Sequence, residues 1–380
     1  MLYKMEIKRI LLAVLLLSLF TTIPSAAESD KTSLNAEFIK VYKQYQTSMK
    51  GKDSADALSL AEKALSLGTK LYGPHHETTA VLTYNYAQVY FINQTKISVT
   101  SREYIESINL FNQALDLYEK IYNENAPELI DPLMSLADVY LKKRRKPKLA
   151  AKYYNRAIRI AEQNKTTMPL LYVDLSLEVG KDLLDSHHIR KSKRYLETAY
   201  NQYRKLLPEN DARVALSTFW LAKYNYFNQD YKDAEPLFLE VVDIYNKAGV
   251  SGGQIALTSN AFLVRVYEKM GLSDKATAHC KAIGKAKPWD GDREQTPIFI
   301  LEPRWPMSAL RSGQTGFVRV GFTISEDGFV EDPEVKDHQG HEKFKKSALD
   351  ALTKWRFAPK FVDGKAVASK VYYTMEFKLE

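Results

Sequence analysis

The chain has 380 residues, which is too long for one ordinary hydrophobic core and therefore predicts two domains. Its hydrophobic content of 45% and charged content of 26% are typical of folded globular proteins and exclude a wholly disordered chain. The net charge of +8 is accompanied by no nucleic-acid-binding motif, so no nucleic acid is expected as a partner.

Residues 1–27 have the three-part pattern of a secretory signal peptide. Basic residues precede an apolar run from Ile10 to Phe20, and the small residues Ser25-Ala26-Ala27 follow. The run is shorter than the ~20 residues that a membrane span needs. We therefore expect cleavage after Ala27 and export to the periplasm. The alternative is an uncleaved N-terminus that stays in the inner membrane, with the rest of the chain facing the periplasm.

Residues 28–288 are expected to form an all-α repeat domain, because small residues recur in two parallel series. The two series share a period near 42 residues and one insertion near residues 95–103. Two helices per period predict a solenoid of stacked helical pairs, with small residues where helices cross closely. The members are Ala64, Ala114, Ala157, Ala199 and Val241 in one series, and Ala87, Ala137, Val179, Ala222 and Val264 in the other.

The segment Leu65–His76, LSLGTKLYGPHH, is followed by ETTAVLTYNYAQVY. It resembles the long tetratricopeptide (TPR) variant of kinesin-light-chain-type repeats, and the resemblance covers roughly residues 35–287. It implies an array that docks a protein partner. The many Tyr and Asn residues either line a concave peptide groove or serve as packing and surface residues, and the sequence leaves both interpretations open.

Residues 295–380 are expected to form a small α+β domain in the order β-β-α-β. Alternating apolar residues predict the strands, and a one-sided apolar stripe predicts the helix. Pro333 predicts a bulge or a sheet edge in the second strand. The last strand is expected at a sheet edge, since no later element is present to cover it. The elements are Gly316–Ile324, a turn at Asp327-Gly328, Phe329–Lys336, a helix from about Glu342 to Trp355, a turn at Asp363-Gly364, and Val371–Leu379.

Residues 303–380 resemble the TonB C-terminal domain family. The resemblance rests on Trp305-Pro306, Gly316-x-Val318-x-Val320-x-Phe322, Asp327-Gly328-x-Val330, Trp355-Arg-Phe-x-Pro359 and Asp363-Gly364. It implies that the domain captures a segment of a TonB-dependent receptor, or of another Ton-system component, by adding it beside the last strand. The positions that this implies for partner binding are Trp305, Pro306, Val371, Tyr372, Tyr373, Thr374, Met375, Glu376 and Phe377.

Several aromatic and proline residues of this domain also fit structural roles. Trp355, Phe357 and Pro359 are interpreted as core residues, whereas Trp305 and Pro306 fit either role. Energised members of the family keep a membrane anchor and a Pro-rich spacer, and here a compact repeat array takes the place of the spacer. The sequence therefore favours a non-enzymatic periplasmic adaptor, with a membrane-anchored TonB-type energy transducer for outer-membrane transport as the alternative.

No catalytic, cofactor or metal site is expected. His279 and Cys280 are neighbours on a predicted helix, so their side chains diverge, and the single cysteine is interpreted as a buried, inert thiol. His338 and His341 supply two imidazoles in a predicted loop without a third ligand. The basic run at residues 142–148 is either a solvated turn or a contact for anionic lipid, cell wall or an acidic partner, which leaves membrane proximity open.

Overall fold

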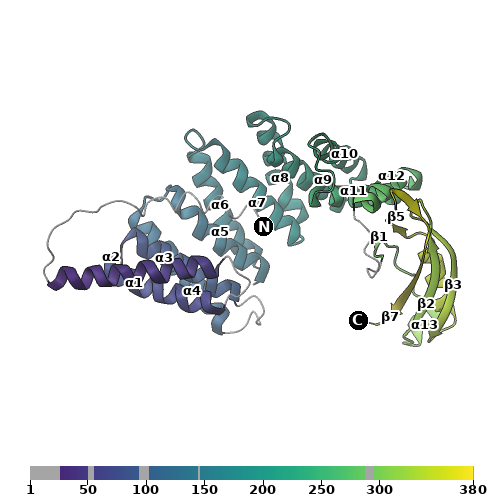
Figure 1. Cartoon of the computed structure of the whole chain (residues 1–380), viewed down its shortest axis with the longest axis horizontal. Helices are drawn as coiled ribbons and strands as arrows, with labels where there is room; N and C mark the ends of the chain where they lie inside the picture. The colour runs from purple at the N-terminus through teal and green to yellow at the C-terminus, as the bar shows by residue number, and fades with distance from the viewer. Residues whose placement is uncertain (1–25, 50–54, 94–101, 144–145, 287–294, 380) are drawn as a thin grey trace. The chain divides into compact units, whose positions relative to one another are not determined.

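The computed structural model describes residues 26–49, 55–93, 102–143, 146–286 and 295–379 (Figure 1). The expected signal peptide lies outside these residues except for Ala26 and Ala27, which begin helix α1. In the part of the chain that is described, no helix is long and apolar enough to cross a membrane. The chain divides into two compact units, residues 1–153 and 154–380, and each is described by itself.

The first unit is built from antiparallel helices. The four predicted positions of small residues within it, Ala64, Ala87, Ala114 and Ala137, are all buried, so helices do cross closely there. Its elements are α1 (Ala26–Ser48), α2 (Ala55–Tyr72), α3 (Glu77–Asn93), α4 (Arg102–Ile121), the 3-10 helix η4 (Pro127–Leu129), α5 (Ile130–Asp138), the π-helix η5 (Val139–Lys143) and the first part of α6 (Pro147–Gln163).

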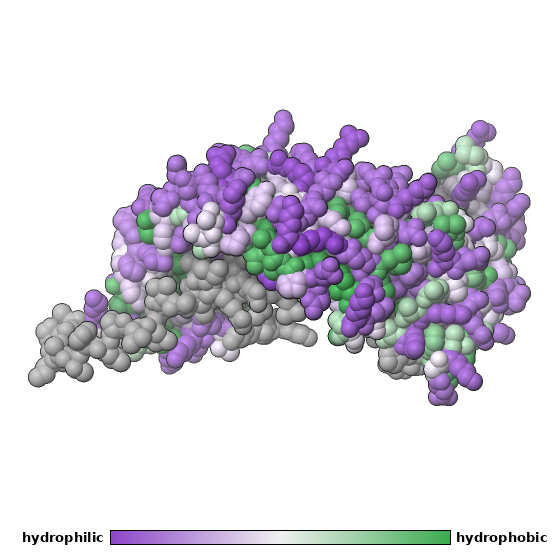
Figure 2. Space-filling view, turned by 90° about the horizontal axis from the view of Figure 1, so that it is seen from above, coloured by the Kyte–Doolittle hydropathy of each residue, from purple (hydrophilic) through white to green (hydrophobic). Residues whose placement is uncertain are grey.

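The second unit continues the helical repeats. The predicted small residues of both series are buried here as well, for example Ala222 and Val264 at 0% exposure, which confirms the solenoid. Figure 2 shows hydrophilic residues over the upper part of one face of the molecule and a band of hydrophobic residues below them. The helices are α7 (Pro169–Asp185), α8 (Ile189–Leu206), α9 (Ala212–Phe227), α10 (Tyr231–Lys247), α11 (Gln254–Met270) and α12 (Ser273–Ala286).

The same unit ends in the predicted β-β-α-β domain. Its antiparallel sheet has the strand order β3-β2-β7, formed by Val330–Gln339, Gly316–Ile324 and Ser369–Phe377. Helix α14 (Lys343–Leu352) follows β3 and buries Phe344, Ala348 and Leu352 against the sheet in one core. The fold class read from the sequence is therefore confirmed.

Two small strand pairs were not predicted. Strand β1 (Pro297–Phe299) pairs with β4 (Arg356–Phe357). Strands β5 (Lys360–Val362) and β6 (Lys365–Val367) form a hairpin around Asp363-Gly364, the predicted turn, where both residues have positive φ, 49° and 77°.

Three predicted boundaries differ from the structure, and one of them is the last strand, which is Ser369–Phe377 instead of Val371–Leu379. Strand β3 continues to Gln339, so His338 lies opposite Val318 in the sheet instead of in a loop. Helix α14 ends at Leu352, and Trp355 lies beyond it because the chain turns there to bring β4 beside β1. Trp355 is nevertheless buried, as its apolar position predicted.

Candidate protein-binding site

Strand β7 forms one edge of the three-stranded sheet. It pairs with β2 over its whole length, from Gly316 opposite Phe377 to Ile324 opposite Ser369, without a register shift. Its other side is paired with no strand in the described part of the chain. A regular strand with an unpaired side presents a row of N–H and C=O groups that another extended segment can complete.

The side chains of β7 alternate between the core and solvent, as predicted. Met375 and Phe377 are buried among the core residues of the domain, and Val371 and Tyr373 pack against the same core. On the opposite face, Tyr372 is 59% exposed, and Thr374 and Glu376 are exposed. The structure thus gathers the seven predicted β7 residues along one edge, where outward side chains can influence which segment pairs there.

Trp305 lies at the Phe377 end of this edge. Its half-buried ring packs edge-on against Phe344 and Phe377, at centroid distances of 5.8 and 5.6 Å. Pro306 follows as the N-cap of the short helix α13 (Met307–Arg311), on which Met307 is 60% exposed. Trp305 therefore contributes to the core while lying beside β7, which leaves both of its predicted roles open.

The opposite edge of the sheet, β3, is irregular. Its pairing with β2 shifts register twice, and Asp332 has a φ of 48° next to Pro333, which has no N–H to donate. Exposed charged residues crowd this edge, namely Glu331, Asp332, Glu334, Lys336 and Asp337. Proline, bulges and charge are features that block strand pairing at an edge. Of the two edges, β7 is thus the one without these interruptions.

Arg356 connects the C-terminal domain to the last helical pair, a role not predicted from the sequence. Its side chain is 1% exposed, and Nη1 lies 2.8 Å from Oε1 of Glu268 in α11. The guanidinium also donates to the carbonyl of Ser273, to Oγ1 of Thr277 and to the carbonyl of Asp327. The available signal was a charged residue inside the otherwise apolar run from Trp355 to Phe357.

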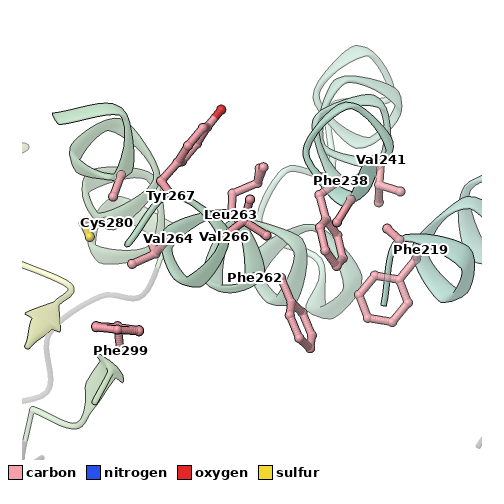
Figure 3. Close-up of a cluster of buried hydrophobic side chains, with 13 residues drawn as sticks. Phe219, Phe238, Val241, Phe262, Leu263, Val264, Val266, Tyr267, Cys280 and Phe299 are labelled. Atoms are coloured by element: carbon pink, nitrogen blue, oxygen red, sulfur yellow. The ribbon is translucent and has the colours of Figure 1, made fainter. Parts of the chain in front are cut away.

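Close packing surrounds this arginine. Phe299 of β1 joins a buried cluster with Val264 of α11 and Cys280 of α12 (Figure 3). A Cβ atom on Gly284 of α12 would lie 2.3 Å from the carbonyl oxygen of Pro359, so only glycine permits the observed approach. We call the contacts made by Arg356, β1 and α12 the joint, and it holds the domain directly against the repeats.

His279 and Cys280 lie in different surroundings. Burial lowers the pKa of His279 to about 4, and its Nδ1 lies 2.8 Å from Oδ1 of Asn260. Burial raises the pKa of the Cys280 thiol to about 11, and the residue is fully buried, which confirms that part of the prediction.

His338 and His341, both predicted in a loop, have separate partners. His338 pairs with Glu342 at 2.9 Å, and Nδ1 of His341 accepts a hydrogen bond from the backbone of Lys343. Among the described residues, no group of three or more His, Cys, Asp or Glu side chains is arranged to hold a metal ion.

Comparison with known proteins identifies both parts of the chain. The family model "Gram-negative bacterial TonB protein C-terminal" matches residues 302–379, and a tetratricopeptide repeat model matches residues 100–163. Protein TonB of Pseudomonas aeruginosa is 34% identical over 89 residues, which are 23% of this chain and 26% of that protein. Protein TonB of Vibrio cholerae is 31% identical over 80 residues, 21% of this chain and 33% of that protein. The matches thus span about a quarter to a third of those two proteins.

Two solved structures are similar to parts of this chain. The crystal structure of BtubC (BKLC) from P. vanneervenii is 15% identical, covers 67% of this chain and 100% of its own, and gives a TM-score of 0.50, which is a likeness of fold alone. The solution NMR structure of the Pseudomonas aeruginosa TonB CTD is 33% identical and covers 24% of this chain and 91% of its own, with a TM-score of 0.21. The chain carries tetratricopeptide repeats followed by a TonB-type C-terminal domain, a combination that indicates a role in protein interaction.

Proposed function

We propose that this chain, with a TonB-type domain behind tetratricopeptide repeats, is a non-enzymatic periplasmic adaptor. Its C-terminal domain pairs by strand addition along β7 with a segment of a TonB-dependent transport component. Its repeats dock a second protein. No cofactor is needed for either role, because both depend on backbone hydrogen bonds and side-chain contacts.

The contrast between the two sheet edges carries this proposal. Strand β7 combines an unbroken register with an unpaired side, whereas β3 is interrupted by Asp332 and Pro333. An added strand gains main-chain hydrogen bonds only where its partner is regular over several residues. Val371 to Phe377 meet that condition, and Trp305 borders the same edge.

Hydrogen–deuterium exchange on the full chain tests the proposal. The probe is a peptide from the periplasmic N-terminus of a TonB-dependent transporter. Added peptide should slow exchange of amides in residues 369–377, while residues 330–339 serve as the internal control because β3 keeps its exposed edge. Protection confined to β3, or a peptide that binds without protecting β7, would remove the proposal.

The membrane-anchored transducer is the competing function, and the two differ in the fate of residues 1–27. N-terminal sequencing of the protein isolated from its own cells separates them. A first residue at Glu28 supports the adaptor. An intact Met1 in the membrane fraction supports the transducer.

A further inference from the structure

One row of side chains repeats along the first helices of the last three helical pairs. Lys181 of α7, Lys223 of α9 and Arg265 of α11 are separated by the repeat period, so they occupy equivalent positions. Trp220 and Phe262 precede the latter two by three residues, which places each on the same helix face as its cation. The row therefore follows from the repeat itself.

Cation–aromatic contacts connect the row from helix to helix. The amino groups of Lys181 and Lys223 lie 5.3 and 4.0 Å from the centroid of the Trp220 ring. Lys223 also lies 5.9 Å from the ring of Phe227, which packs edge-on against Phe262. Arg265 lies 5.4 Å from that Phe262 ring. We call these six residues (Lys181, Trp220, Lys223, Phe227, Phe262 and Arg265) the cation–aromatic row.

The α11 end of the row already holds an extended segment, which belongs to this chain. Nε of Arg265 donates to the carbonyl of Ile298 in β1 at 2.9 Å. The next residue, Phe299, is 9% exposed and inserts its ring beside Val264 (Figure 3). Here a cation binds a backbone carbonyl and an apolar cluster holds an aromatic ring. Proteins use both kinds of contact to bind extended peptides.

Lys223, the α9 member of the row, forms an ion pair with the carboxylate of Asp185. The Lys223 amino group lies 3.0 Å from Oδ1 of Asp185, whose side chain is 50% exposed whereas that of Lys223 is 17% exposed. A sheltered ammonium beside an aromatic ring interacts more strongly with an anion than a fully hydrated one does. Phe227 is 44% exposed next to it and offers apolar contact area.

We propose that the cation–aromatic row docks an extended acidic segment of a protein partner, in line with β1. Acidic side chains would pair with Lys181 and Lys223, and apolar ones would cover Trp220 and Phe227. This inference rests on the docking role proposed above for the repeats, and it assigns that role a surface and a partner chemistry. It does not depend on pairing at β7.

A pair of peptides matched in length and in apolar residues but different in charge tests the inference on the full chain. One is a capped synthetic peptide of alternating Asp and Phe, and the other has Asn in place of each Asp. The Asp peptide should bind at least about tenfold more tightly than the Asn peptide, because charge-assisted hydrogen bonds are worth more than neutral ones. Its protection in hydrogen exchange should fall on α7 and α9, which distinguishes it from binding at residues 369–377.

Lysine variants then locate the site. Lys223→Gln should weaken binding of the Asp peptide about tenfold, and Lys181→Gln should weaken it in the same direction. Lys232→Gln, at an exposed position of α10, is the matched control and should leave the affinity unchanged. Equal affinity for the two peptides, or equal losses in Lys223→Gln and Lys232→Gln, would overturn the inference. Self-association of the chain in place of peptide binding would overturn it as well.

Discussion

Replacing Glu268 with alanine is expected to open the joint between the C-terminal domain and the last helical pair. The substitution removes the carboxylate that pairs with Arg356 and leaves the guanidinium buried at 1% exposure. It also removes the acceptor of the hydrogen bond that Ser273 donates to Oε2 of Glu268. The neighbouring carbonyls and Thr277 satisfy part of the guanidinium, but none of them carries a compensating negative charge.

The loss of stability expected for Glu268→Ala follows from the burial of Arg356. Removing one partner of a buried ion pair costs about 3–5 kcal/mol, because the remaining charge stays in a medium of low dielectric constant. A second ion pair at the same interface, Lys281 with Asp327, is a matched control, since its side chains are 43% and 52% exposed. Exposed pairs contribute about 0–1 kcal/mol. Lys281→Ala should therefore have a small effect at the same joint.

Urea unfolding of the full chain, followed by circular dichroism and by hydrogen exchange at α12, measures both variants. Glu268→Ala should lower the free energy of opening at α12 by several kcal/mol more than Lys281→Ala does. A double-mutant cycle with Arg356→Met should show coupling, because the double variant no longer carries an unpaired buried charge. Equal losses in the two alanine variants would refute the role given to the joint.

Three further results are expected from single residues near the joint. The pKa of His279 is lowered to about 4 in the folded protein. Between pH 4 and 6.5 the folded state therefore binds fewer protons than the unfolded state. The contribution of His279 to the free energy of unfolding should therefore be fully present above pH 6.5. It should fall by up to ~3 kcal/mol as the pH drops to 4. Urea midpoints across this range should change less in His279→Gln. Cys280 should resist a thiol reagent in the native protein and react faster in Glu268→Ala, since the thiol is buried beside the joint. Gly328→Ala should cost about 1–3 kcal/mol in urea unfolding, because Gly328 has a φ of 82° and a Cβ there would lie 2.2 Å from the Phe357 carbonyl oxygen.

The sequence was sufficient for the architecture because the features that specify it are periodic. Small residues at a constant spacing predicted where helices cross, and all of them are buried. The alternation in Gly316–Ile324 and near the C-terminus predicted two strands, and Pro333 predicted the irregular edge. Such patterns report on local packing along one element, and they need no knowledge of what that element faces.

Contacts between segments far apart in the chain left no periodic signal. Strand β1 has three residues and pairs with a two-residue strand 57 to 60 positions later, which is too short for alternation to be recognised. Arg356 looked like an isolated charge in an aromatic motif, since its partner Glu268 is 88 residues away. Trp355 was placed in the helix because its apolar face matched, although the chain turns before it.

The joint determines where a pull on the sheet would go. A segment added along β7 would lie parallel or antiparallel to β2. A force along the axis of that segment would load many of its hydrogen bonds together instead of breaking them one after another. The tension would then pass through the core to β4 and enter α11 at the carboxylate of Glu268. Because Arg356, Phe299 and Gly284 are closely packed at the joint, such a force would reach α11 and α12 through buried side chains.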